Sequence, residues 1–246
     1  DNAYFKWSNT DPYVGPLNSV GVSRKSARPY LYSSCLDVIA HEWGHGVITT
    51  SANFSLDPQV NEDGAQLHEG FADVIGHATE WYRQPAGTTC EKAEWKMGED
   101  NGTATRRVDT DDGAGGYALH CDDDPSNPGS HARGNALAAA FRLLDVGGQN
   151  PVCTRLPGLS GCSTTVGALG LTKSSKILFR VLTVYAVSTT GWDELVDMAV
   201  VSAFDLYSHC VSCSEAVLEQ QRSYDAFKAI GYASNPFVQE ECISCP

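Results

Sequence analysis

The sequence lacks a long hydrophobic run and has few basic residues. No stretch approaches the roughly 18 apolar residues that a membrane-spanning helix needs, and 17 Lys and Arg stand against 30 Asp and Glu, for a formal net charge of −13. Nucleic acids and anionic membranes repel an acidic surface, so neither is an expected partner. The chain begins with neither Met nor a signal-like stretch. This predicts a processed mature protein. We also expect a monomer and a removed propeptide.

Cysteine, by contrast, is plentiful, with nine in 246 residues. The pairs Cys210–Cys213 and Cys242–Cys245 could form a zinc ribbon, but they are far apart and one lies at the end of the sequence. Cysteines scattered through an acidic chain are more typical of a secreted protein with disulfides. Cys153 and Cys162 flank a loop rich in Pro and Gly and are the local pair that we predict, whereas the odd ninth cysteine has no assigned partner.

Hydrophobic periodicity predicts a mainly helical chain. After residue 33 we expect one helix through HEWGH at 41–45 and a second over 66–81, followed by an irregular stretch rich in Gly, Asp and Thr over 85–132. From Gly134 the pattern is helical again, and Gly231 predicts the end of the last helix. Prolines interrupt the first 32 residues, where short strands are expected. The predicted fold class is therefore α+β, mainly α.

The HEWGH segment carries the first candidate site. His41 and His45 are four residues apart, so their rings lie on one face of the predicted helix and can share a metal ion. Glu42 lies one residue on, where it can reach water at that metal without being a ligand. The alternative is a buried helix with two core histidines, since such a string occurs by chance in about one in a hundred chains of this length.

The next helix, with HEGFADVIG, supplies residues that favour the metal. Catalytic zinc commonly takes three protein ligands, and Glu69 can be the third. Asp73 follows four residues later on the same face and can accept a hydrogen bond from a ligand histidine, which fixes its tautomer. His68 points about 100° away from Glu69, which predicts a core or surface residue. His77 is a weaker alternative ligand.

Acidic residues continue the polar stripes of both helices. Asp37 extends the first stripe and Glu80 the second, and Glu94 and Glu99 of EWKMGED are placed to supply further oxygens. An oxygen-rich cluster of this kind is typical of a calcium site. The alternative is a solvated acidic face.

HEWGH followed by NEDGAQLHEGFADVIG resembles the thermolysin family of secreted zinc endopeptidases. AEWKMGED is similar to the calcium-binding segment of that family, and DNAYF is similar to its substrate-binding edge strand. The C-terminal helical lobe of the family is similar to the segment GALGLTKSSKILFRVLTVYAVSTTGWDELVDMAVVSAFDLY. The resemblance runs over nearly the whole chain, although most of the family's N-terminal β-rich lobe has no counterpart. HEGFAD also resembles the fungalysin-type proteases, but the short gap between HEWGH and HEGFAD and the C-terminal segments favour thermolysin.

The resemblance implies a zincin-like fold in a single metallopeptidase domain, 1–246, with a zinc- and calcium-binding portion over 1–132 and a helical lobe over 133–246. It implies one catalytic Zn²⁺ and one structural Ca²⁺, because Lys96 stands where members with two calcium ions carry an acid. The implied residues are His41, His45 and Glu69 for zinc, with Asp73 orienting a ligand; Glu42 as general base and His131 at the oxyanion; Asp37, Glu80, Glu94, the Lys96 carbonyl and Glu99 for calcium; and Asn2, Ala3 and Arg107 for substrate.

The predicted function is hydrolysis of peptide bonds in proteins or peptides by a secreted, extracellular zinc endopeptidase. Arg106 replaces a residue that is apolar in relatives and lines their primary specificity pocket. This predicts an altered preference for the substrate residue that follows the cleaved bond. Two alternatives are kept. A noncatalytic zinc- and calcium-stabilised, disulfide-rich binding protein of this fold would not need Glu42 or His131. An inhibitor or adhesion module held by disulfides would leave HEWGH to chance.

Overall fold

The structure is a computed structural model that describes residues 35–84, 93–98, 106–111, 117–123, 129–208 and 213–232, with the backbone of two strands at 2–6 and 19–23. Side chains of residues 213–216 are not described. Some of the predicted features therefore lie outside the described residues: Glu99, the side chains of Asn2 and Ala3, and the paired cysteines near the C-terminus.

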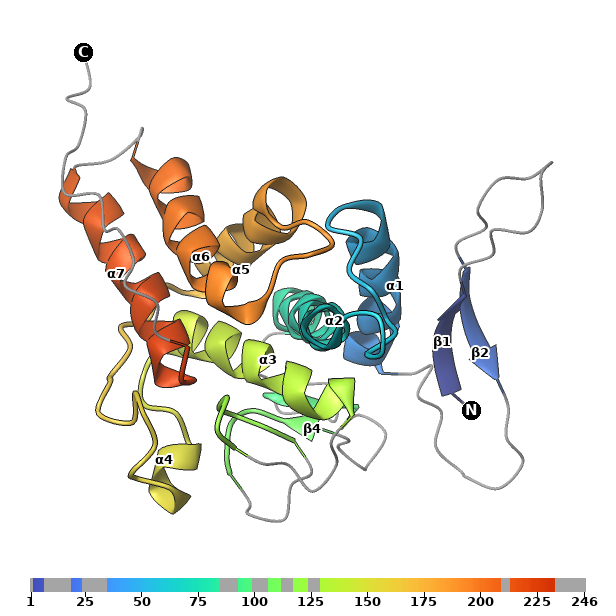
Figure 1. Cartoon of the computed structure of the whole chain (residues 1–246), viewed down its shortest axis with the longest axis horizontal. Coiled ribbons are helices and arrows are strands. Elements are labelled where there is room, and N and C mark those ends of the chain that lie inside the picture. Colours follow the sequence, from blue (N-terminus) through green and yellow to red (C-terminus); the bar gives the residue numbers. More distant parts are fainter. Residues whose placement is uncertain are drawn as a thin grey trace.

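Two short antiparallel strand pairs make up the β structure of the described residues. β1 (Asn2–Lys6) pairs with β2 (Ser19–Ser23), with Asn2 opposite Ser23, and this pair contacts α1 (Leu36–Thr50) (Figure 1). β3 (Lys96–Met97) pairs with β4 (Arg106–Arg107). The strands expected in the first 32 residues are therefore present.

All other elements in the described residues are helices, so the prediction of a mainly helical chain is confirmed. α2 lies between α1 and α3, and the remaining long helices pack against α3 and against one another (Figure 1). After α1, the helices are α2 (Glu62–Arg83), α3 (Ser130–Val146), α4 (Val152–Arg155), α5 (Leu171–Arg180), the π-helix η3 (Val181–Tyr185), α6 (Trp192–Tyr207) and α7 (Cys213–Ala229).

The start of α2 is set by a capping residue. Asn61 precedes the helix in an extended conformation, and its side chain accepts a hydrogen bond from the Gly64 N–H at 3.0 Å. Glu62 and Asp63 occupy the first turn, where the helix dipole favours negative charge. The helix therefore begins four residues before the predicted start and carries the whole HEGFAD segment.

α3 begins at Ser130, four residues earlier than predicted from Gly134. Gly134 does not start this helix but lies inside it, where α3 crosses α2 with no room for a side chain. A Cβ atom on Gly134 would lie 2.5 Å from the Gln66 carbonyl oxygen, and one on Gly70 would lie 2.7 Å from the Gly134 carbonyl oxygen. The earlier start places His131 in the first turn of α3, beside α2.

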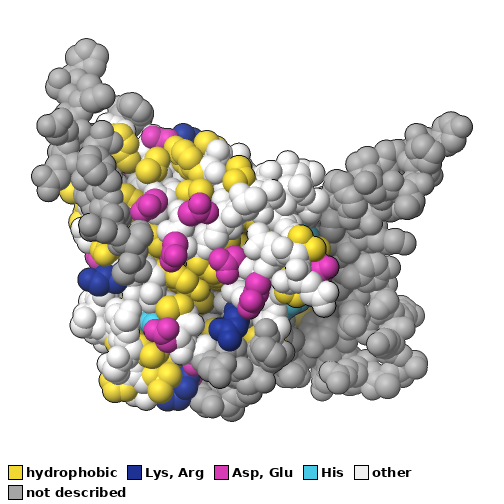
Figure 2. Space-filling model, viewed as in Figure 1, with side chains coloured by type: hydrophobic (Ala, Val, Ile, Leu, Met, Phe, Trp, Pro, Cys, Tyr) yellow, Lys and Arg dark blue, Asp and Glu magenta, His cyan; other side chains and the backbone are white. Residues whose placement is uncertain are grey.

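One hydrophobic core connects α1 and α2 with the later helices. Its largest fully buried side chains include Phe71 of α2, Phe141 of α3 and Phe227 of α7. The predicted disulfide between Cys153 and Cys162 is confirmed. In the described part of the chain, no helix combines the length and apolar character that crossing a bilayer requires. Acidic side chains are spread over the face shown in Figure 2 rather than gathered into one block.

Candidate metal centre

Three histidines converge on one carboxylate oxygen of Glu69. The Oε2 atom of Glu69 lies 3.2 Å from Nε2 of His131, 3.4 Å from Nε2 of His41 and 3.8 Å from Nε2 of His45. Two of these distances exceed the usual N–H···O range, and the third is at its upper limit. This spacing suits groups arranged around a metal ion better than groups that are bonded to one another.

Glycines bring the three helices of this site close together. A Cβ atom on Gly44 of α1 would lie 3.1 Å from the Ala72 Cα of α2. Gly44 immediately precedes His45, and Ala72 immediately precedes Asp73, so the α1–α2 contact occurs beside the candidate ligands. The α2–α3 contact at Gly70 and Gly134 likewise adjoins Glu69. The site therefore lies where backbones, rather than large side chains, set the distance between helices.

Asp73 lies behind His41, away from the Glu69 carboxylate. Its Oδ1 atom is 2.7 Å from Nδ1 of His41 and 2.5 Å from a terminal nitrogen of Arg106. His41 is 3% exposed and Asp73 is 1% exposed, so the pair is screened from water. An Asp73 carboxylate that accepts from Nδ1 leaves Nε2 of His41 as the metal-facing nitrogen, as predicted for an orienting residue.

The charges of the metal-free site are strongly coupled. Burial opposes the charged form of His41, but the neighbouring Asp73 and Glu69 carboxylates outweigh it and raise the pKa of His41 to about 9. Burial lowers the pKa of His45 to about 3, and His41 adds to that effect. Burial opposes ionisation of Glu69, yet the neighbouring histidines lower its pKa to about 2. The metal-free site therefore holds an ionised carboxylate and one protonated imidazole, and His45 is neutral.

The donor set fits zinc. Imidazole nitrogens and a carboxylate oxygen are standard zinc ligands, and the ligand atoms of His41, Glu69 and His131 all lie within 4.8 Å of one another. The side chain of His131 is 49% exposed, whereas His41 and Glu69 are buried. His131 thus lies at the open side of the site, where a substrate would approach. Glu42, next to His41, is half-buried.

Arg106 and Arg107 point in different directions from β4. Arg106 is the arginine that reaches the site, through Asp73, although the resemblance assigned the substrate carbonyl to Arg107. The Nε of Arg107 instead lies 3.1 Å from Oδ1 of Asp109. Successive residues of a strand face opposite sides, so only one of the two can face the site. Arg106 is held by Asp73, so it does not simply line the specificity pocket as the resemblance suggested. No motif in the sequence indicated this ion pair.

The residues predicted for calcium are only partly brought together. Asp37 and Glu80 are fully buried, and Oδ2 of Asp37 accepts a hydrogen bond from the Gly98 N–H at 2.5 Å. Glu94 pairs with the ammonium group of Lys96. Buried carboxylates are costly without a compensating positive charge or donors. The calcium site therefore stays a prediction.

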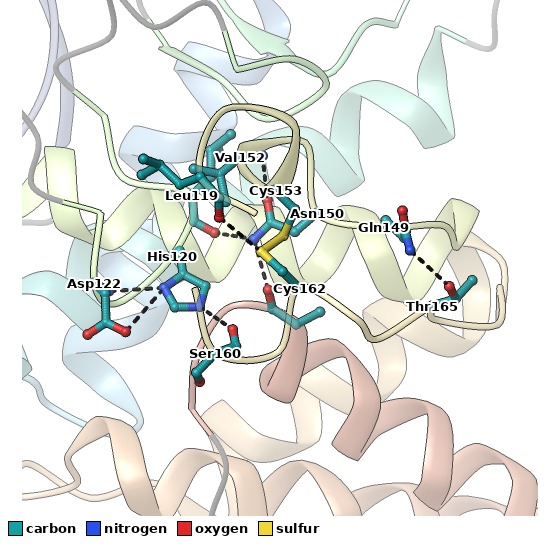
Figure 3. Close-up of a disulfide and its surroundings, with 12 residues drawn as sticks. Leu119, His120, Asp122, Gln149, Asn150, Val152, Cys153, Ser160, Cys162 and Thr165 are labelled. Carbon is teal, nitrogen blue, oxygen red and sulfur yellow. Dashed lines mark hydrogen bonds and ion pairs between the residues drawn. A yellow bond between two sulfur atoms is a disulfide. The ribbon is translucent and has the colours of Figure 1, made fainter. Parts of the chain in front are cut away.

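A second group of potential ligands has its nitrogens occupied. His120, Cys121 and Asp122 lie close enough to hold an ion, but Nε2 of His120 is 2.7 Å from the Ser160 carbonyl oxygen and therefore donates to it. Nδ1 of the same ring accepts from the Asp122 N–H at 3.0 Å (Figure 3). Both nitrogens of a neutral imidazole are then used. This histidine links the 117–123 segment to the loop closed by the disulfide.

The two histidines of α2 that were not assigned to the metal are both buried. His68 is 1% exposed and contacts His45, which agrees with a core position. His77 is also 1% exposed, and its ring lies 5.6 Å from that of Trp95. Burial lowers the pKa of His77 to about 4. In the described residues His77 is not part of the group around Glu69.

Comparisons with known proteins agree with this geometry. Residues 59–231 match the family described as "Thermolysin metallopeptidase, alpha-helical domain". The thermostable neutral protease NprT of Geobacillus stearothermophilus is 26% identical over 212 residues, which are 79% of this chain and 33% of that protein. Thermolysin of Alicyclobacillus acidocaldarius subsp. acidocaldarius is 27% identical, again over 79% of this chain and 33% of that protein. An extracellular elastase of Staphylococcus epidermidis is 30% identical over 71% of this chain and 29% of that protein.

A solved structure supports the fold. The precursor of protealysin, a metalloproteinase from Serratia proteamaculans, superposes with a TM-score of 0.51 and 19% identity, over 82% of this chain and 59% of that one. This chain spans about a third of the length of the curated relatives. The family match confirms the predicted resemblance. It also favours thermolysin over the fungalysin type.

Proposed function

Because the chain belongs to the thermolysin family of metallopeptidases, we propose that it is a secreted zinc-dependent endopeptidase that hydrolyses peptide bonds in proteins or peptides. The observation that carries the proposal is the convergence of three imidazoles on the Glu69 carboxylate, with Asp73 behind one of them. A core that only needed to bury histidines would have no reason to collect them around one carboxylate oxygen.

His41, His45 and Glu69 would hold one zinc ion. The metal, when bound, lowers the pKa of a coordinated water and polarises the scissile carbonyl. Asp73 holds the proton of His41 on Nδ1, so that Nε2 is free to bind. Arg106 contacts the same Asp73 oxygen at 2.5 Å, neutralises that carboxylate and keeps it in place.

Glu42 and His131 would carry the proton transfer and the charge stabilisation. Glu42 follows the ligand His41 and is half-buried, so its carboxylate can take a proton from the attacking water and pass it to the leaving amine. His131 is half-exposed and lies beside Glu69, where its ring can donate to the oxyanion of the tetrahedral intermediate. Such donors are typically worth about 3–4 kcal/mol of transition-state stabilisation.

The remaining parts of the proposal concern the setting of the enzyme. The related Staphylococcus epidermidis elastases are named extracellular, and the solved relative is a precursor, so secretion and a removed propeptide are proposed for this chain. One calcium ion, with Asp37 and Glu80 among its ligands, is proposed from membership of the thermolysin family. The division into a metal-binding portion over 1–132 and a helical lobe over 133–246, and the monomeric state, remain predictions.

Hydrolysis of casein tests the proposal. We expect the wild type to cleave it, a chelator to abolish cleavage and added zinc to restore it. Glu42→Ala should lower the rate by about 100-fold to 10,000-fold while zinc stays bound, because it removes a general base and no ligand. Glu62→Ala, which changes an exposed carboxylate at the start of α2, is the matched control and should retain activity.

Two results would contradict the proposal. A wild type that binds one zinc ion per chain but does not cleave casein would favour the noncatalytic binding protein. Activity that survives removal of all metal would exclude zinc-dependent chemistry at this site.

A further inference from the structure

A cavity on the far side of α2 from the candidate metal centre has no part in the proposed catalysis. It measures about 340 Å³ and is lined by residues of α1, α2, α5 and η3. Both α1 and α5 pack on α2, and the cavity separates them (Figure 1). Phe71, Ile75 and Ala78 of α2 line it, and at about 100° per residue they lie on the side of that helix opposite Glu69.

The walls of this cavity are almost entirely apolar. Most of the lining side chains are aliphatic or aromatic, among them Val47 of α1, Ile75 of α2 and Leu178 and Phe179 of α5. Phe179 is 54% exposed and Ile75 is half-buried, so the cavity opens to solvent. Its volume lies in the range of small-molecule sites, and water finds few hydrogen-bond partners on such walls. The cavity therefore suits an apolar chain.

Lys176 is the charged residue of the lining, and it is exposed. The other two basic residues of α5 are neutralised, because Lys173 pairs with Glu219 and Arg180 with Asp205. Among the described residues, Lys176 forms no such ion pair. An ammonium group at the mouth of an apolar cavity is complementary to a negative charge at the end of an apolar chain.

We propose that this cavity binds a free long-chain fatty carboxylate. The hydrocarbon chain lies between α1 and α5, against Ile75 and Leu178, and the carboxylate contacts the ammonium group of Lys176. Burial of the chain supplies most of the affinity, whereas the exposed ion pair adds less and selects the sign of the head group. The ligand is free in solution, because an anionic membrane would be repelled by a protein of net charge −13. This inference does not depend on the proposed peptidase activity.

Calorimetric titration of the intact chain with dodecanoate, below its micelle concentration, tests the inference. Affinity should rise by up to about fourfold for each CH₂ group added from octanoate to dodecanoate. Dodecyltrimethylammonium, which has the same chain and a cationic head, should bind more weakly. Lys176→Glu should reverse that preference. Lys228→Glu, the same charge change on α7 and outside the lining, is the matched control and should leave the preference as in the wild type.

A second variant and NMR locate the bound chain. Ala78→Leu places a larger apolar side chain in the cavity and should abolish dodecanoate binding. Val201→Leu enlarges an exposed apolar residue of α6 outside the lining and should retain binding. In the wild type, nuclear Overhauser effects should connect the dodecanoate chain with the methyl groups of Ile75 and Leu178. The NMR measurement needs no variant, so it holds even where a substitution impairs folding.

The inference is overturned if dodecanoate does not bind, if binding survives Ala78→Leu, if Lys176→Glu leaves the head-group preference unchanged, or if the NMR contacts lie elsewhere. It is also overturned if sedimentation shows a dimer that Ala78→Leu dissociates, because a second copy of the chain would then occupy the cavity. Cleavage of casein is a separate measurement, so a failure here is distinguishable from a failure of the proposed function.

Discussion

Two groups of histidine and carboxylate in this protein have a similar composition and differ in what their nitrogens do. Around Glu69, the Nε2 atoms of three histidines lie 3.2–3.8 Å from one oxygen, at or beyond ordinary hydrogen-bond lengths. Around His120, both ring nitrogens are committed, one to the Ser160 carbonyl at 2.7 Å and one to the Asp122 N–H at 3.0 Å (Figure 3).

Burial alone does not distinguish these groups, because His41 is 3% exposed and His120 is 0% exposed. The difference lies in the partners. A histidine whose two nitrogens bond to backbone groups holds chain segments together. Histidines whose Nε2 atoms gather around one carboxylate oxygen, with an orienting carboxylate behind one of them, are instead arranged for a cation. The comparison therefore predicts opposite responses to substitution.

The largest expected effect follows from Glu69→Gln. This change removes the carboxylate on which three imidazoles converge, so zinc affinity should fall by more than the roughly 10-fold to 100-fold loss that is typical of outer partners. Zinc competition with a chelator measures the loss. Glu62→Gln, an exposed change about two turns earlier on the same helix, should bind zinc like the wild type; equal affinities for the two variants would end the assignment of Glu69 as a ligand.

A smaller change in zinc affinity is expected when the pH is changed. The pKa of His41 in the metal-free protein is raised to about 9 because the neighbouring Asp73 and Glu69 carboxylates outweigh the effect of burial. Zinc needs the deprotonated nitrogen, so apparent affinity should rise about tenfold per pH unit from neutral pH and level off near pH 9. Competition with a chelator of known protonation measures this slope.

Asp73→Asn sharpens the pH measurement. Without the carboxylate, the pKa of His41 should drop, and the affinity should level off at a lower pH. A wild-type affinity that is flat between about pH 7 and pH 9 would contradict the raised pKa and the ion pair that causes it.

The smallest effect on zinc is expected at the second group. His120→Phe should leave zinc affinity unchanged, because this ring is committed to Ser160 and Asp122. It should instead lower the free energy of unfolding of the metal-free protein by about 1–3 kcal/mol, since the Ser160 carbonyl and the Asp122 N–H both lose their hydrogen-bond partner. Urea unfolding gives that value. If zinc affinity fell as far as in Glu69→Gln, the distinction between the two groups would be wrong.

The sequence was sufficient to predict which candidate ligands lie together wherever helical spacing alone decides their geometry. His41 and His45, or Glu69 and Asp73, are four residues apart, and the structure places each pair on one face of α1 or α2. The α1–α2 assembly could therefore be predicted. The approach of His131 to Glu69 could not, because it depends on a crossing between helices that are far apart in the sequence.

The two arginines of β4 mark a second limit of sequence reasoning. In a strand, a shift of one residue moves a side chain to the opposite face, and a strand of two residues has no hydrophobic alternation that would reveal its register. The sequence therefore could not decide whether Arg106 or Arg107 reaches Asp73. The Met97–Arg106 pairing with β3 fixes that choice.

The contact between Gly70 and Gly134 has a consequence for how this site tolerates change. Because α2 and α3 meet backbone to backbone, and a Cβ atom on either glycine would lie only 2.5–2.7 Å from an opposing carbonyl oxygen, the separation of Glu69 and His131 does not depend on the size of any side chain between them. Substitutions elsewhere in the core can therefore accumulate and alter the stability of the protein while the distance between Glu69 and His131 stays the same. Gly70 and Gly134 themselves lack that freedom, and so does Gly44 at the α1–α2 contact beside His45.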